Sequence, residues 1–267
     1  MFMLRNRSCY FKDGWLCQLG ITIAVITGIF GFAGCGTALA QGDTEESVIS
    51  FGFESDAVSR YVWNGLAFSE GAVWQNFAWA SARSFEVSLW SNYGLASKVP
   101  GPRMDEIDVA VAYSTSLFNI EFQPALRALY FPDQPDNPNT AELSLNLSYP
   151  VGFLTPYTYH SVDIKAYEGA YFGELGVVSS WDINDRASLE IAGGIGWGAA
   201  KYNEAYFRHS KNALELVTLD ACMTYCFTSS LYIRPHLAVS SLFDNDLKHL
   251  VDDPTIFQVG AAVGIEW

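Results

Sequence analysis

The sequence predicts an all-β protein: a transmembrane antiparallel up-and-down β-barrel of about twelve strands, with ten or fourteen strands as the alternatives. The chain of 267 residues alternates apolar and polar residues with a period of two over most of its length. Aromatic residues make up 15% of it and charged residues only 16%, against about 25% charge in ordinary soluble domains. After position 45 it has no apolar run of the roughly 18 residues that a membrane-spanning helix needs.

The N-terminus has the pattern of a secretory signal. An uncharged stretch, GITIAVITGIFGFAGC, follows a basic start formed by Arg5, Arg7 and Lys12. It leads to Ala38 and Ala40 in an Ala-x-Ala arrangement. We therefore expect a signal peptide over residues 1–40 that is cleaved after Ala40. The alternatives are a transmembrane anchor, for which the apolar stretch is short and glycine-rich, and lipid attachment at Cys35.

Cleavage after Ala40 would leave a short periplasmic segment over residues 41–47 and a barrel over 48–267. The removed segment carries three bases and one acid, Asp13, so the formal net charge would move from −14 to −16. Such acidity argues against nucleic acid as a partner, because nucleic-acid binding needs a basic surface. It fits a protein exported by a Gram-negative bacterium.

Strand alternation is clear along the rest of the chain. In SFEVSLWSNYG, for example, Phe85, Val87 and Leu89 share one face, and Glu86 and Ser88 share the other. Each such run is long enough to cross a bilayer as a tilted strand of ~9–11 residues. The predicted strands cover residues 48–63, 73–82, 84–93, 105–115, 119–130, 140–149, 153–162, 169–181, 187–198, 213–225, 230–240 and 257–267.

The connections between these runs alternate between short and long. Short ones such as SAR and DINDR alternate with long ones such as AAKYNEAYFRHSKN and SLFDNDLKHLVDDPT. An even strand number with short turns at one rim and long loops at the other is typical of outer-membrane barrels. Both ends of the barrel should then face the periplasm. The alternative, a secreted soluble β-sandwich, would turn its apolar face inward, and twelve long aromatic strands would be unusual for it.

The chain ends on FQVGAAVGIEW, whose apolar face finishes with an aromatic residue. This closing strand resembles the recognition signal that the barrel-assembly machinery reads in outer-membrane proteins. The resemblance implies an assembly signal formed by Phe257, Val263, Ile265 and Trp267. A terminal tryptophan also suits the aromatic girdle at a membrane interface.

The segment ESDAVSRYVWNGLAFSEGAVWQNFAWAS, followed by FEVSLWSNYGL, resembles the TorF-like or Gcw_chp-type bacterial outer-membrane proteins, a family of largely unassigned function. The matching positions are Tyr61, Gly65, Gln75, Trp90 and Asn92. Asn64 stands where the family usually has arginine. The match covers about fifty residues, and it implies an outer-membrane barrel but no substrate.

If the apolar face meets lipid, the opposite face lines the lumen, and acids outnumber bases there. The charged or titratable candidates for the lumen wall are Arg60, Glu86, Asp108, Glu121, Arg127, Glu142, Glu174, Glu190, Arg234 and His236. Excess carboxylates in a wet lumen would favour cations. Alternatively, the arginines could pair with carboxylates in a filled interior. The small residues on the inner side of 187–198 either leave space for solutes or accommodate bulky neighbours.

The function we expect is a narrow porin-like channel for small hydrophilic solutes, with a preference for cations. The alternative is a closed structural or surface-interaction barrel whose outer loops bind lipid or a partner. An enzyme is less expected, because none of the four histidines has a serine two residues further on, the spacing that would place both on one strand face. The sequence offers no catalytic residue, cofactor or metal pattern.

One loop gathers basic residues that could meet lipid head groups. Arg208, His209 and Lys211 lie within YFRHSKN, where they could bind lipopolysaccharide phosphates; a plain surface loop is the alternative. The expected partners are outer-membrane lipid and lipopolysaccharide, the barrel-assembly machinery and small solutes.

Overall fold

The computed structural model describes residues 49–267 apart from residues 70, 96–102 and 135. The predictions for the signal peptide, its cleavage after Ala40, attachment at Cys35 and the 41–47 segment lie outside these residues. Twelve long strands build the wall: β1 (Ile49–Val58), β4 (Val73–Ala82), β5 (Phe85–Gly94), β6 (Arg103–Tyr113), β8 (Ile120–Tyr130), β9 (Thr140–Ser148), β10 (Leu154–Asp163), β11 (Tyr171–Asn184), β12 (Ala187–Gly198), β13 (Ala213–Cys226), β14 (Leu231–Leu242) and β15 (Thr255–Glu266).

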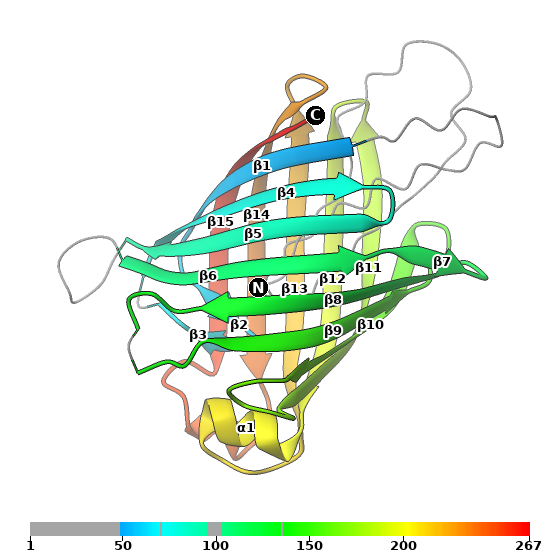
Figure 1. Cartoon of the computed structure of the whole chain (residues 1–267). Helices are drawn as coiled ribbons and strands as arrows, with labels where there is room; N and C mark the ends of the chain where they lie inside the picture. The colour runs from blue at the N-terminus through cyan, green and yellow to red at the C-terminus, as the bar shows by residue number, and fades with distance from the viewer. Residues whose placement is uncertain (1–48, 70, 96–102, 135) are drawn as a thin grey trace.

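The twelve strands form a closed antiparallel barrel, as the sequence predicted (Figure 1). Each long strand pairs with its neighbour along the chain, and β1 pairs with β15 to close the circle. The short strand β7 (Thr115–Leu117) adds a small hairpin against β8. Closure gives each of the twelve long strands a partner on both sides among the described residues, as a wall within a bilayer requires.

The first strand is shorter than predicted. It ends at Val58 rather than 63, and the chain then forms a separate hairpin of β2 (Val62–Trp63) and β3 (Leu66–Ala67). The reason is the Asn64–Gly65 pair, whose φ angles are +46° and +80°. Asn-Gly is the preferred sequence for a tight two-residue hairpin turn, because both positions need positive φ.

The two rims of the barrel differ. Short turns and both ends of the barrel lie at one rim, the short-turn rim; β1 starts and β15 ends there. The opposite, long-loop rim carries the β2–β3 hairpin, the helix α1 (Ala200–Phe207) and the 3-10 turn η1 (Leu247–His249) (Figure 1). In the described ranges, neither helical segment has the length and apolarity to cross a membrane.

The outward face of the wall is apolar and exposed. Phe257 is 77% exposed, Val259 61% and Leu175 58%, and each alternates with a buried or half-buried residue. Large apolar side chains exposed around a closed barrel are stable when lipid covers them. The face predicted to meet lipid therefore points outward.

Candidate functional site

The inner face of the barrel is strongly acidic. Eleven carboxylates and two guanidinium groups are buried on the wall strands. The carboxylates belong to Glu54, Asp56, Glu86, Glu106, Asp108, Glu142, Asp163, Glu174, Glu190, Glu215 and Asp220, and the guanidinium groups to Arg127 and Arg234. Strand alternation places them there, because each lies opposite in phase to the exposed apolar residues.

One buried ion cluster centres on Arg127 of β8. Its guanidinium group forms an ion pair with Glu142, its register partner on β9, and its Nη1 lies 3.7 Å from Oδ2 of Asp108 on β6. Beside this cluster, the hydroxyl of Tyr61 donates to Glu106 Oε2 at 2.8 Å. All three strands are neighbours in the wall, so the ion pairs run along the wall rather than across the lumen.

A second cluster joins β14 to β1 across the closing strand β15. Arg234 forms an ion pair with Glu54, and Tyr232 donates to the same carboxylate at 2.8 Å. Nearby, His236 Nε2 lies 2.9 Å from Asp56 Oδ2. These side chains reach β1 by passing over the inner face of β15, which carries only small residues at this level.

The small residues of β15 make this reach possible. Gly260 lies under His236 and Gly264 under Tyr232; a Cβ added there would be 2.4 Å and 2.1 Å from the respective ring atoms. Ala262, opposite Arg234, is fully buried between them. The chain closure is therefore held by backbone ladders and by side chains that bond two strands away.

The structure places the predicted lumen residues on the inner face of the wall, with Arg60 as the exception. Glu121 is in phase with Arg127 on β8; it is half-buried near the short-turn rim and accepts a hydrogen bond from Ser148 at 2.9 Å. Arg60 lies outside the wall, because β1 ends before it, and its Nη1 contacts Asp253 Oδ2 at 2.6 Å. Arg60 thus ties the β1–β4 connection to the β14–β15 loop, and its prediction as a wall residue was wrong for this reason.

The β2–β3 hairpin folds into the long-loop mouth, which sequence reasoning missed. Trp63 is 5% exposed and its ring lies 4.8 Å from that of Tyr206 on α1, centre to centre. Asn64 Nδ2 donates to the Tyr202 hydroxyl at 2.9 Å. The Asn-Gly dipeptide was the signal for this hairpin; nothing local showed that it would turn inward.

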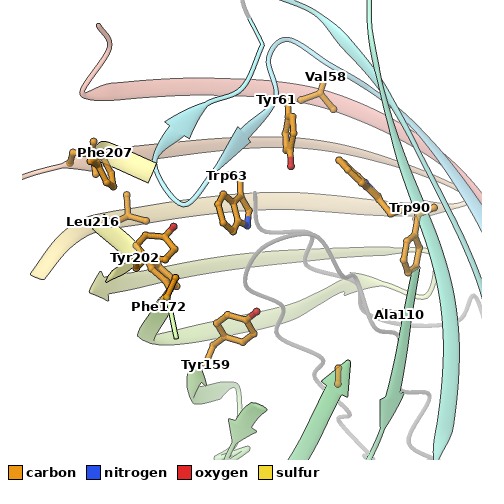
Figure 2. Packing of buried hydrophobic residues seen from close by; sticks show 14 of the residues in the cluster. Val58, Tyr61, Trp63, Trp90, Ala110, Tyr159, Phe172, Tyr202, Phe207 and Leu216 are labelled. Atoms are coloured by element: carbon orange, nitrogen blue, oxygen red, sulfur yellow. The ribbon is translucent and has the colours of Figure 1, made fainter. Parts of the chain in front are cut away.

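Aromatic rings connect the hairpin to the wall. The rings of Tyr61 and Trp90 on β5 lie 5.5 Å apart, and those of Tyr202 and Phe172 on β11 lie 5.2 Å apart. Figure 2 shows Trp63 between Tyr61 and Trp90 on one side and Tyr202, Phe172 and Leu216 on the other. Hairpin, helix and wall therefore form one packed aromatic cluster that narrows the mouth.

Lys211 in the predicted basic loop forms ion pairs with two aspartates. Lys211 Nζ lies 2.8 Å from Asp244 Oδ2 and 2.7 Å from Asp246 Oδ2, which joins the α1 loop to the β14–β15 loop. Arg208 is the exposed residue after α1, with a left-handed φ of +56°. Hence Lys211 is paired within the protein, and lipopolysaccharide binding by this loop stays a prediction.

Comparisons with known proteins give structural similarity only. No family model matches the chain, and no characterised protein matches it in sequence. The NanC porin matches with a TM-score of 0.48 and 13% identity over 80% of this chain and 98% of its own. The KdgM porin in complex with disordered oligogalacturonate matches with a TM-score of 0.47 and 10% identity, over 82% and 98%.

An outer membrane channel from Pseudomonas putida F1 matches with a TM-score of 0.44 and 11% identity, over 85% of this chain and 100% of its own. The resemblance to TorF-like or Gcw_chp-type proteins stays a hypothesis, since no family model supports it. The chain's own geometry carries the conclusion: a closed barrel of twelve long strands, apolar outside and acidic inside, is a protein of the bacterial outer membrane.

Proposed function

We propose that the protein is a narrow outer-membrane channel for small hydrophilic solutes with a preference for cations. The excess of acid on the inner wall carries this proposal: eleven buried carboxylates against two guanidinium groups, a difference of nine. Carboxylates away from bulk solvent need water, hydrogen bonds or cations around them. Rings of such groups in a pore favour the passage of cations.

The two arginine clusters neutralise only a small part of this excess of carboxylates. Arg127 pairs with a carboxylate on an adjacent strand and Arg234 with one two strands away. Neither pair bridges the lumen in the part of the chain that the structure describes. Twelve strands enclose more space than the eight that side chains just fill, and less than the sixteen of wide porins, which supports a narrow passage.

The inward hairpin is the observation that favours the alternative, a closed barrel whose loops bind lipid or a partner. Trp63 and its aromatic neighbours pack against the wall rather than lining a wide opening. In the channel proposal the same hairpin is the constriction. The two proposals differ in whether ions pass when the hairpin is intact or loosened.

The proposal contains no catalytic step. The ring nitrogens of His160 contact Tyr171 and Thr158, and His236 contacts Asp56, so neither ring is paired with a serine nucleophile.

Single-channel recording tests the proposal. The mature protein, purified from outer membranes, is inserted in a planar bilayer under a KCl gradient, and the reversal potential is measured. We expect steady openings, with a reversal potential of the current that is shifted towards the equilibrium potential of K⁺. Glu86→Gln should reduce the selectivity, whereas Glu168→Gln, the same change in an exposed loop, should leave it unaltered.

A folded barrel that stays silent both as wild type and as Trp63→Ala would overturn the channel proposal in favour of the closed barrel. Openings that prefer chloride would overturn the cation preference alone.

A further inference from the structure

We propose that a cavity beneath the β2–β3 hairpin binds a small monovalent cation, with Asp220 as its charged ligand. This inference rests on the proposed function and deepens it, because it assigns one place where a permeating cation would pause. It concerns the inner faces of β13 and β14, further along β14 than Arg234 and nearer the long-loop rim.

The cavity lies between the hairpin and the wall. The hairpin forms its roof, the inner faces of β13 and β14 form its side, and β15 contributes one residue. The lining residues are Val62, Asn64, Gly65, Leu216, Thr218, Asp220, Ala238, Val239, Ser240 and Gln258.

Two of the lining side chains are buried without a hydrogen-bond partner. Asp220 is 4% exposed and its Oδ2 has none; Thr218, two residues earlier on the same face, is 5% exposed and its Oγ1 has none. A buried carboxylate oxygen without a donor carries a large desolvation cost. A cation in the cavity would supply the missing interaction.

The two amide side chains that line the cavity donate hydrogen bonds to residues outside its lining. The Nδ2 of Asn64 donates to Tyr202, and the Nε2 of Gln258 donates to the backbone oxygen of Arg60 at 2.7 Å. With their nitrogens engaged elsewhere, their carbonyl oxygens are available as ligands. The polar groups offered to the cavity are therefore one carboxylate, one hydroxyl and amide oxygens.

A second buried carboxyl group lies beside the site. Glu174 on β11 lies over Gly194 of β12, where an added Cβ would be 2.6 Å from its Oε1, and Gly194 is the register partner of Thr218. The Glu174 carboxylate accepts a hydrogen bond from Tyr157. The absence of a side chain at Gly194 thus brings this carboxylate towards the cavity.

The donor set points to a monovalent ion. Calcium takes about 6–8 oxygen ligands and usually several carboxylates, whereas one carboxylate lines this cavity. Neutral carbonyl and hydroxyl oxygens replace the hydration shell of potassium in selective pores. Ammonium has a similar size and would donate hydrogen bonds to the same oxygens, so potassium and ammonium share the chemistry that the site recognises.

Thermal unfolding of the purified barrel in detergent tests the site without requiring conduction. The melting temperature Tm is measured in KCl, in NH4Cl and in tetramethylammonium chloride at equal ionic strength, since the last cation is too large for the cavity. At saturating potassium or ammonium we expect Tm to lie about 2–4 °C above its value in tetramethylammonium. Comparison of the two small cations shows which one the site prefers.

Asp220→Asn, which keeps the side-chain shape and removes the charge, should abolish that difference. Asp185→Asn, the same change in an exposed turn at the other rim, should preserve it. If Asp220→Asn fails to fold, Thr218→Val removes one ligand and should reduce the difference. An equal Tm in all three salts, or a difference that survives both lumen substitutions, would overturn the proposal.

The same samples separate this inference from the channel function. If the barrel does not conduct but potassium stabilises it through Asp220, the cation site is supported and the channel function is overturned. If the barrel conducts, shows no stabilisation and has a conductance that rises linearly with salt, the channel function is supported and the cation site is overturned.

Discussion

Arg127 shows how single residues stabilise the acidic wall. Its side chain is 4% exposed and forms an ion pair with Glu142 while Asp108 lies within 4 Å. One guanidinium group therefore offsets two carboxylates that are both close to fully buried. Replacement by a shorter or neutral side chain would leave these charges without compensation.

We expect Arg127→Met to destabilise the barrel by about 3–5 kcal/mol, the usual cost when one partner of a buried ion pair is removed. The measurement is urea unfolding of the detergent-solubilised protein. The double variant Arg127→Met with Glu142→Gln should recover part of this loss of stability, because it removes one of the two carboxylate charges that Arg127→Met leaves uncompensated. Equal stability of Arg127→Met and wild type would show that water already solvates the two carboxylates.

At the scale of elements, the β2–β3 hairpin is the constriction of the proposed channel. It is attached to the wall by the Tyr61–Glu106 hydrogen bond and to α1 by Asn64 and Trp63. These contacts are few compared with the ladders of the wall, so the hairpin is the element that substitutions can loosen without unfolding the barrel.

Trp63→Ala should therefore increase the single-channel conductance, because it removes the ring that packs against Tyr206 at the mouth. Trp181→Ala provides the matched control: this ring is on the outer face at the other rim and is 39% exposed. An unchanged conductance in Trp63→Ala would place the constriction elsewhere in the lumen.

The contact between the α1 loop and the β14–β15 loop should depend on pH. Burial opposes ionisation of Asp244, but hydrogen bonds from Lys211 and from backbone amides hold its pKa below the usual 3.8. Hydrogen bonds to Asp244 and Asp246 raise the pKa of Lys211 above the usual 10.5. The lowered pKa makes the Asp244 contribution present above about pH 3.8 and lost as pH falls through its folded value.

The raised pKa of Lys211 makes its contribution present below pH 10.5 and lost as pH rises further. Between these limits we expect the two loops to resist proteolysis. As the pH falls below 3.8 and through the folded pKa of Asp244, pepsin should cleave them faster relative to an unstructured peptide measured at the same pH. Lys211→Met should be cleaved faster than wild type above pH 3.8, and its relative rate should rise less as the pH falls. Lys248→Met should behave like wild type, and a pH effect that persists undiminished in Lys211→Met would assign it to other groups.

At the scale of the whole molecule, Trp267 extends the ladder between β15 and β1 that closes the barrel. The backbone of Trp267 exchanges two hydrogen bonds with Phe51, of 3.1 and 2.9 Å, and their rings lie 5.3 Å apart. Phe51 belongs to the first strand, so this contact joins the two ends of the barrel at the short-turn rim. We propose that the same residue serves as the end of the assembly signal.

Deletion of Trp267 should lower the amount of folded barrel in the outer membrane more than it lowers the stability of the barrel once folded. The first is measured as the heat-modifiable fraction in membranes, and the second by unfolding of the purified protein. Trp181→Ala, which removes an outward tryptophan elsewhere, should leave assembly intact. A deletion variant that assembles at wild-type levels would remove the terminal residue from the signal.

The sequence by itself predicted the wall: its class, about twelve long strands, the face that meets lipid and the inward position of Glu86, Asp108, Glu142, Glu174 and Glu190. These follow from a period of two, which is local and repeats along every strand. Only the tertiary structure decided how distant residues meet: the inward direction of the hairpin at Asn64, the reach of Arg234 over β15 to Glu54, and the cavity at Asp220. Those features depend on strand register and closure, which bring together residues as distant in the chain as Glu54 and Arg234, 180 positions apart, and which the local period of two does not encode.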